Sequence, residues 1–184
     1  MRVLIEGRPG SGKTTAAARL AHLLGERNVE VQGFVTDEVR ESGTRVGFTV
    51  RSFRGDAATL AHVDLPGPPR VGKYGVDLDA FERVALPTLD AIPTDGVVVI
   101  DELGKMELAS ARFRESVLQL LDAPIITVAT VHAFRHPFTD ELKRRPGVEQ
   151  IKLTRANRDT VPAQLVERLL DAVGDSSRFR FARD

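Results

Sequence analysis

The chain has no cysteine, no excess charge of either sign and no long apolar run. The lack of cysteine excludes disulfide bonds, thiol catalysis and metal centres that need cysteine ligands. Lysine and arginine total 26, as do aspartate and glutamate, so no positive field indicates nucleic acid or an anionic membrane as a partner. No apolar segment approaches membrane-spanning length, and Gly7 ends the first one too early for a signal peptide. We therefore expect a cytoplasmic protein without membrane contact.

The length of 184 residues is that of one ordinary domain, and we assign residues 1–184 to a single unit. Apolar stretches with strand character alternate with stretches of helical spacing. Strands are predicted at 3–5, 29–36, 97–101, 125–131 and 148–153, a hairpin at 39–53, and helices at 14–26, 79–91, 110–121, 137–145 and 160–173. The segment 65–69 is predicted as a loop, Pro87 is expected to kink or shorten its helix, and the polar tail 176–184 is expected to be frayed. This alternation predicts an α/β fold, a mostly parallel sheet with an added antiparallel hairpin.

The segment Gly7–Thr14 reads GRPGSGKT and matches the pattern G-x-x-x-x-G-K-[ST] between a predicted strand and a predicted helix. Glycines let successive backbone N–H groups turn inward toward a phosphate group. Lys13 can reach the outer phosphate oxygens, and the Thr14 hydroxyl can ligate Mg²⁺. We therefore predict a nucleotide-binding phosphate loop, formed by Gly7, Arg8, Pro9, Gly10, Ser11, Gly12, Lys13, Thr14 and Thr15.

Two adjacent acids, Asp101 and Glu102, follow the most apolar predicted strand. An acid at the carboxyl end of a central strand lies beside the phosphate loop, so Asp101 is predicted to hold Mg²⁺. Glu102, directly after it, is placed to polarise an attacking water as a general base. Taken with Lys13, this pattern favours hydrolysis of a nucleoside triphosphate.

Beyond the phosphate loop and the acid pair, five further segments are similar to those of a known family. They are GFVTDEVR at 33–40, RVGF at 45–48, VGKYGV at 71–76, DELGKMEL at 101–108 and TRANRD at 154–159. Together they resemble the THEP1-type nucleoside-triphosphatase family over nearly the whole chain, from Met1 to about Val173. The resemblance implies a RecA-like three-layer P-loop domain that hydrolyses ATP, GTP, CTP and UTP with Mg²⁺, shows little base selectivity, and acts less efficiently on some diphosphates.

The resemblance also implies roles for residues outside the two motifs. Lys105 is similar in position to a lysine suggested to stabilise transition-state charge in place of an arginine finger. Asn157 and Arg158 follow the last strand, where P-loop proteins commonly hold the base, and Arg158 is a candidate to stack on it. A helix N-cap at Asn157 or Asp159 is an equally good interpretation, and it does not exclude the first.

Five positions remain open. Arg8 stands where family members often carry proline or glutamate, and it either contacts the terminal phosphate or faces water. His132 replaces a usual proline; we expect a solvated loop there, with a contact to the terminal phosphate as the alternative. Arg40, Arg45 and Lys73 either close over the substrate or lie on the solvated face of a hairpin whose Phe34 and Phe48 pack inward. The other histidines, His22, His62 and His136, show no metal-ligand spacing and are predicted to be surface or packing residues.

Two other functions fit a phosphate loop. A small-molecule kinase needs an acceptor site and a basic lid, for which Arg135, Lys143, Arg144 and Arg145 are candidates. A nucleotide-dependent binding switch needs a partner, and the residues 157–159 do not match the Asn-Lys-x-Asp pattern of guanine-specific switches. The protein partner, if one exists, is unknown from the sequence. Hydrolysis with water as acceptor is favoured over both.

Overall fold

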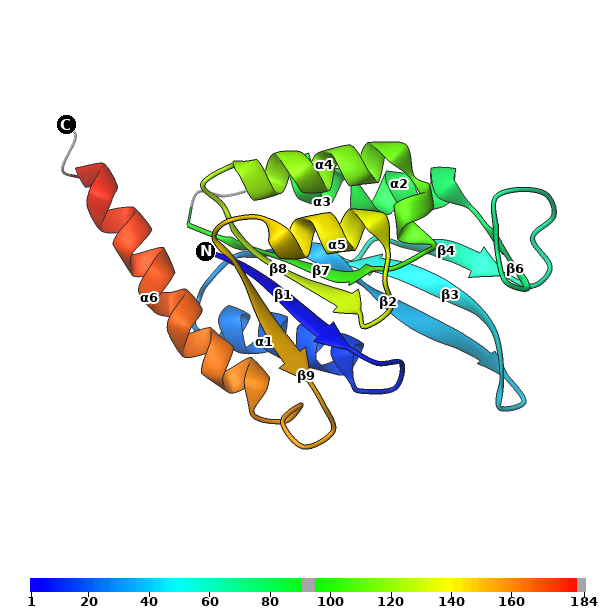
Figure 1. Ribbon diagram of the computed structural model, residues 1–184, viewed down its shortest axis with the longest axis horizontal. Helices are drawn as coiled ribbons and strands as arrows, with labels where there is room; N and C mark the ends of the chain where they lie inside the picture. Colours follow the sequence, from blue (N-terminus) through cyan, green and yellow to red (C-terminus); the bar gives the residue numbers. More distant parts are fainter. Residues whose placement is uncertain (91–94, 182–184) are drawn as a thin grey trace.

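The structure is a computed structural model that describes residues 1–90 and 95–181. Its strands form one sheet in the order β5-β6-β4-β3-β2-β7-β8-β1-β9 (Figure 1). The strands are β1 (Arg2–Gly7), β2 (Val31–Glu41), β3 (Thr44–Ser52), β4 (Ala57–His62), β5 (Arg70–Val71), β6 (Tyr74–Val76), β7 (Val97–Leu103), β8 (Ile126–His132) and β9 (Val148–Leu153). The helices are α1 (Lys13–Glu26), α2 (Leu78–Ala85), α3 (Pro87–Asp90), the 3₁₀ turn η1 (Glu107–Ala109), α4 (Ala111–Asp122), α5 (Pro137–Arg144) and α6 (Val161–Phe181).

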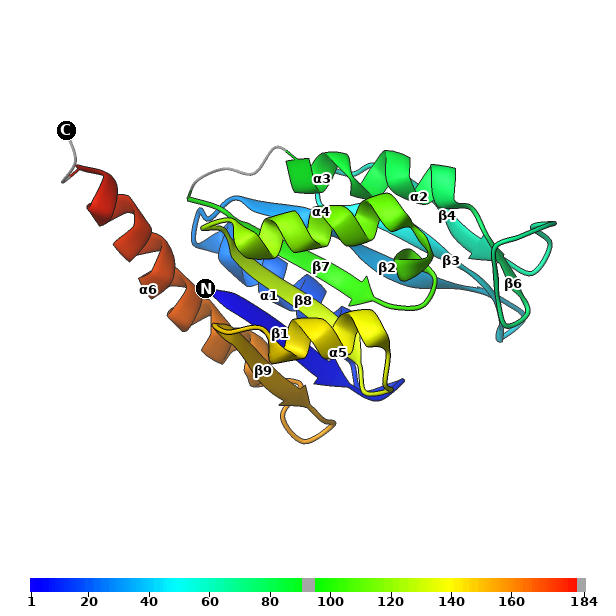
Figure 2. The same ribbon diagram turned by 45° about the horizontal axis from the view of Figure 1, so that its top comes forward.

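Helices cover both faces of the sheet, which gives three layers. Helices α1 and α6 lie on one face, and α2, α3, α4 and α5 lie on the other (Figures 1 and 2). A separate cluster of buried apolar side chains fills each interface: Leu20 and Leu165 belong to the first cluster, and Phe81 and Phe113 to the second. In the described part of the chain, no helix is long and apolar enough to cross a bilayer.

The strands that carry the motifs are parallel neighbours in the centre of the sheet. β8 pairs in parallel with both β1 and β7, and β1 also pairs in parallel with β9. β7 is buried almost throughout because both of its faces are covered, which explains its unbroken apolar run. The carboxyl ends of these strands therefore meet at one edge, and the loops that follow them are brought together.

The structure confirms the α/β class and corrects several boundaries. The predicted strand at 29–36 and the first arm of the hairpin form one continuous strand, β2, which turns into β3 at Ser42 and Gly43. Strands β4, β5 and β6 extend the antiparallel side, and sequence reasoning missed all three. Pro87 divides the helix predicted at 79–91 into α2 and α3, as expected, while Ala91 lies outside the described residues.

The tail was predicted to fray from Ser176, but the backbone is helical as far as Phe181. Residues 182–184 lie outside the described part. The remaining helices and strands lie within a few residues of their predicted positions, and β9 coincides with its prediction.

Candidate active site

The phosphate loop connects the end of β1 at Gly7 to the start of α1 at Lys13. Gly10 and Gly12 have φ values of 72° and 95°, in the left-handed region that side chains with a Cβ rarely adopt. Gly7 is required for space, because a Cβ there would lie 2.3 Å from Ser11 Oγ. The glycines of the motif therefore give the loop its tight curve, and its backbone N–H groups lead into the N-terminus of α1.

Lys13 joins the phosphate loop to the acid predicted as the general base. Its side chain is buried, and Nζ donates to the Gly7 carbonyl at 3.2 Å and lies 3.1 Å from Glu102 Oε2. Glu102 is partly exposed, so its carboxylate can meet both the lysine and solvent. The structure thus brings Lys13 of the phosphate loop into contact with Glu102, the predicted general base, near the carboxyl end of β7.

Asp101 is fully buried at the end of β7 and has one unused oxygen. Thr130 Oγ1 on β8 donates to Oδ1 at 2.6 Å, and Oδ2 has no hydrogen-bond partner. Burial raises the pKa of Asp101 to about 6, although the nearby hydroxyls of Thr130 and Thr14 oppose the shift. A buried carboxylate oxygen without a partner, next to a threonine hydroxyl, is the oxygen donor set that Mg²⁺ prefers. Asp101 and Thr14 therefore fit a magnesium ion.

Lys105 lies in the loop after β7 and is exposed. It forms no hydrogen bond or ion pair with the rest of residues 1–90 and 95–181. The structure therefore does not bring it into contact with Lys13 or Glu102, and its catalytic role stays a prediction.

The loop between β9 and α6 separates the roles of Asn157 and Arg158. Asn157 Oδ1 accepts from the backbone N–H of Thr154 at 2.8 Å, and its Nδ2 donates to the Lys152 carbonyl at 2.9 Å. Asn157 thus braces the loop with its side chain; it does not cap α6, which begins at Val161, so the predicted N-cap role of Asn157 is wrong. Arg158 lies against the phosphate loop, since a Cβ on Gly12 would be 3.1 Å from its Cδ. Arg158 also lines a cavity of about 200 Å³ with Gly12, Thr15, Ala16, Arg19 and Asp159.

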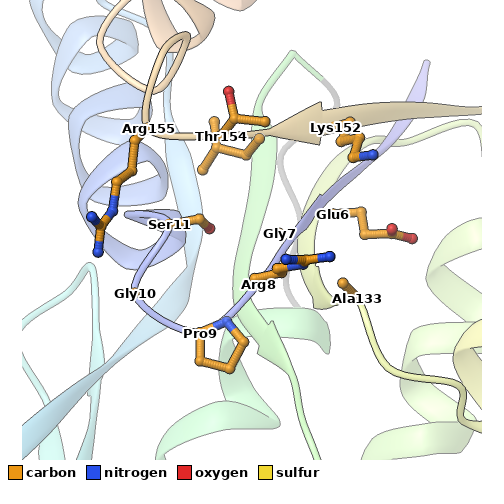
Figure 3. Close-up of a pocket in the computed structure, with 11 residues that line it drawn as sticks. Glu6, Gly7, Arg8, Pro9, Gly10, Ser11, Ala133, Lys152, Thr154 and Arg155 are labelled. Carbon is orange, nitrogen blue, oxygen red and sulfur yellow. The ribbon is translucent and has the colours of Figure 1, made fainter.

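A second cavity, of about 580 Å³, lies on another side of the phosphate loop (Figure 3). Its walls are Glu6 to Ser11, Ala133 and the segment Lys152 to Arg155. Figure 3 shows Arg8 extending toward Ala133, while Arg155 lies on the Gly10 side. Arg8 is exposed on this wall, and Gly12, Lys13 and Thr14 do not line it. Sequence reasoning did not identify Lys152 or Arg155 as part of this surface.

This geometry can be compared with known proteins. The sequence profile of the family described as "NTPase" matches residues 2–166. "Nucleoside-triphosphatase THEP1" of Thermotoga petrophila is 40% identical over 167 residues, which cover 90% of this chain and 91% of that protein. The "Cancer-related nucleoside-triphosphatase homolog" of Mus musculus is 39% identical, covering 96% and 97%. The chain belongs to the THEP1 nucleoside-triphosphatase family.

The THEP1 fold is also the fold of this chain. The crystal structure of THEP1 from Aquifex aeolicus superposes with a TM-score of 0.83 at 35% identity, covering 92% of this chain and 99% of that one. This THEP1-family chain is therefore a P-loop hydrolase that acts on nucleoside triphosphates, and the site at the ends of β1, β7 and β8 is where its family motifs converge.

Within the THEP1 fold, the charged side chains of the β2–β3 hairpin form ion pairs with one another. Arg40 and Arg45 both hold Glu38, and Arg45 also donates to the Tyr74 hydroxyl. Phe34 is fully buried and Phe48 packs against the same cluster, as predicted. Lys73 Nζ lies 5.3 Å from the centre of the Tyr74 ring. These contacts support the solvated-face interpretation of the hairpin.

The cations proposed for a kinase lid are likewise engaged in local contacts. Lys143 pairs with Glu6 at 2.5 Å, and Arg145 pairs with Asp122 at 2.7 Å. Arg144 donates to the Asp140 carbonyl, and Arg135 lies 3.9 Å from the Asp140 carboxylate. Lys143 and Arg145 therefore tie α5 to β1 and to the end of α4, and Arg144 forms a contact within α5.

His132 was expected in a solvated loop, and that expectation is wrong. It is the last residue of β8, its side chain is only 6% exposed, and its ring contacts Phe134 at a centroid distance of 6.0 Å. The strand extends one residue further than its apolar run because Gly7 of β1 still pairs with His132. Of the other histidines, His22 is exposed and His62 and His136 are partly buried, as predicted.

Glu107 is the site residue for which sequence reasoning assigned no role. Its carboxyl is buried in η1, and burial raises its pKa to about 8, with Glu102 adding to the shift. A Cβ on Gly104 would lie 2.6 Å from Glu107 Oε2 and 3.1 Å from Glu102 Oε1, so both acids lie against the same glycine. Its presence in the DELGKMEL segment was the only available signal, because an isolated acid is usually solvated.

Proposed function

We propose that this nucleoside-triphosphatase uses Mg²⁺ and hydrolyses ATP, GTP, CTP and UTP with little base discrimination, with Glu102 activating the attacking water. The observation that carries the proposal is the 3.1 Å contact between Glu102 and Lys13, beside the buried Asp101 and the partly buried Thr14. A phosphate-binding cation, a metal-ligand pair and a solvent-accessible base thus converge at one edge of the sheet.

Each residue has one part in this reaction. The loop N–H groups and Lys13 bind the phosphate chain, and Thr14 and Asp101 hold the metal ion, which supplies charge neutralisation on the phosphate oxygens. Phosphate oxygens compete with Glu102 for Lys13, which leaves a Glu102 oxygen free to accept a proton from water. The water oxygen then bonds to the terminal phosphorus, the bond to the bridging oxygen breaks, and the nucleoside diphosphate leaves.

The nucleoside is placed by Arg158 in the smaller cavity. The guanidinium offers a flat face for stacking, and every base has a π-face, so this contact does not select among bases. Arg19 and Asp159 also line the cavity, but Asn157 is occupied within its own loop. Broad specificity follows from stacking on Arg158, a contact that every base can make. Lys105, which is exposed in the loop after β7, stabilises transition-state charge only once the nucleotide is bound.

The test is phosphate release from each nucleoside triphosphate, with and without Mg²⁺ and with no acceptor added. For Glu102→Gln we expect kcat to fall by about 10²- to 10⁴-fold, because the amide cannot accept the proton. Binding of the nucleotide should be kept. Glu115→Gln, which changes an exposed acid on α4, is the matched control.

Three results would contradict parts of the proposal. Unchanged phosphate release by Glu102→Gln would remove Glu102 as the base. Near silence of the wild type without an acceptor would favour a kinase. A triphosphate-dependent change of conformation together with capture of a protein partner, at negligible turnover, would favour a binding switch.

A further inference from the structure

The cavity of about 580 Å³ beside the phosphate loop is lined by three cationic side chains that no acid neutralises (Figure 3). They are Arg8 of the phosphate loop, Lys152 of β9 and Arg155 of the loop after β9. All three are exposed, and among the residues that the structure describes their side chains form no hydrogen bond or ion pair. Because cationic and anionic residues balance over the whole chain, the cavity has a local excess of positive charge.

The acid in the wall of this cavity is already paired with another residue. Glu6 on β1 is the register partner of Lys152 on β9, so the two side chains lie side by side on one face of the sheet. Glu6 instead pairs with Lys143 of α5, at 2.5 Å. Lys152 is therefore left without a carboxylate, and the charge that would neutralise the cavity is that of a bound anion.

A buried hydroxyl of the phosphate loop is a second sign of a ligand in this cavity. Ser11 lines the cavity, is only 7% exposed, and its Oγ has no hydrogen-bond partner. Folded proteins satisfy nearly all buried polar groups, so an unpaired hydroxyl next to three cations indicates the position of an oxygen-rich ligand. In Figure 3, Arg8 and Lys152 lie on one side of Ser11 and Arg155 lies on the other. Donors therefore approach the cavity from several directions.

Phosphate is the anion that suits this set of donors. A carboxylate carries one negative charge on two oxygens, whereas a phosphate group carries up to two charges and has three terminal oxygens that accept from different directions. Guanidinium groups such as those of Arg8 and Arg155 bind phosphate oxygens through paired N–H donors. The volume is in the range of cavities that enclose a small molecule, so there is room for two linked phosphate groups.

The cavity is separate from the places that the proposed function gives to the nucleotide. It borders the segment Gly7 to Ser11, whereas the cavity of Arg158 borders Gly12 and Thr15, and Lys13 and Thr14 line neither. We propose that this cavity is a second phosphate site, which binds a phosphate group beyond those of the triphosphate. That group belongs either to a longer nucleotide chain or to a separate oligophosphate, and both present the same chemistry to the cavity. The site does not depend on hydrolysis.

The experiment measures the binding of two probes by calorimetry with Mg²⁺. Inorganic pyrophosphate is titrated into the chain after its phosphate loop has been saturated with a non-hydrolysable ATP analogue. Separately, the affinity of a non-hydrolysable adenosine tetraphosphate is compared with that of the ATP analogue. The variants are Lys152→Gln, Arg155→Gln and the two together, and the control is Arg54→Gln, an exposed arginine in the turn between β3 and β4. Thermal unfolding shows that each variant is folded.

In the wild type, pyrophosphate binding beside the analogue identifies a separate oligophosphate as the ligand, and a tetraphosphate affinity above that of the triphosphate identifies a longer chain. Either signal should weaken by roughly tenfold in Lys152→Gln and in Arg155→Gln, because each change removes a charge-assisted hydrogen bond, while Arg54→Gln should match the wild type. Affinity for the ATP analogue should stay within twofold.

Two results would overturn the proposal. One is the absence of both signals in the wild type. The other is a signal that the double variant keeps in full, or that falls only in step with the affinity for the ATP analogue. Because both readouts are binding measurements, they test the second phosphate site even if Glu102 proves not to be the base.

Discussion

Glu107 is a carboxylic acid that the fold keeps neutral beside the proposed base. Burial raises its pKa to about 8, well above the value of 4.5 for an exposed glutamate. A second negative charge next to Glu102 would repel it and the phosphate chain. A protonated Glu107 avoids that repulsion and fills the space behind Gly104.

This burial predicts a dependence of stability on pH. The unfolded chain releases the Glu107 proton near pH 4.5 and the folded chain retains it until about pH 8. Between these values the free energy of unfolding should fall by about 1.4 kcal/mol per pH unit from this group alone. Urea denaturation without nucleotide at pH 5, 6, 7 and 8 measures this slope. In Glu107→Gln, the fall of the free energy of unfolding with pH should be shallower by about 1.4 kcal/mol per pH unit, because the amide releases no proton. The exposed-site variant Glu115→Gln should match the wild type. A pH dependence of Glu107→Gln equal to that of the wild type would contradict the buried-acid account.

The predictability of single site residues depends on whether their chemistry leaves a local pattern. The phosphate loop and the acids 101 and 102 have fixed spacing next to a strand, so the sequence was sufficient to find them. The burial of His132 depends on pairing with Gly7, which is 125 positions away in the numbering. The burial of Glu107 depends on a 3₁₀ turn folding under Gly104. Contacts of this kind are tertiary, and no local pattern encodes them.

At the scale of elements, the loop from β9 to α6 places a bracing residue, Asn157, directly before an exposed cation, Arg158. Asn157 makes three hydrogen bonds within the loop, and Arg158 projects against Gly12 of the phosphate loop. The first side chain therefore serves the stability of the loop, and the second serves the contact with the nucleotide that we propose.

Alanine at these two positions should have opposite effects. Asn157→Ala should lower the free energy of unfolding by about 1–2 kcal/mol, because it removes internal hydrogen bonds of a partly buried side chain. Arg158→Ala should leave stability within about 0.5 kcal/mol of wild type, since this is an exposed side chain. It should instead raise KM for all four triphosphates by a similar factor. Chemical denaturation and steady-state kinetics measure the two effects, and a base-dependent change of KM would contradict the stacking role of Arg158.

The elements that were predictable carry either an unbroken apolar run or clear turn signals at their ends. β7 and β8 are covered on both faces and show unbroken apolar runs, and β9 is bounded by clear turn signals. β4, β5 and β6 were missed because they are short, two of them have only two or three residues, and they lie at the antiparallel end of the sheet. β4 pairs with β3 and packs against α2, while β6 pairs with β4 and β5, and no short window of sequence displays these contacts.

At the scale of the whole molecule, the active site joins elements from separate layers. The phosphate loop enters α1 on one face of the sheet, while η1 and α5 cover the other face. Lys13 begins α1, and Asp101 and Glu102 lie near the carboxyl end of β7, so all three are at the same end of the sheet. A ligand that bridges them binds only the folded chain, and it therefore adds its binding free energy to the stability of the entire domain.

This linkage predicts a shift in thermal unfolding that needs Mg²⁺ and Lys13. At a concentration 100 times Kd, a non-hydrolysable triphosphate should stabilise the fold by about 2.7 kcal/mol, and for a chain of this size that raises Tm by roughly 5–10 °C. EDTA should abolish most of the shift, because Asp101 is then a buried carboxylate without its counter-ion. Lys13→Ala should abolish it as well, while Lys152→Ala, on the other cavity, should keep it. Differential scanning calorimetry measures all four conditions. A full shift in Lys13→Ala would mean that the triphosphate binds outside the phosphate loop, and a shift independent of Mg²⁺ would contradict the metal role of Asp101 and Thr14.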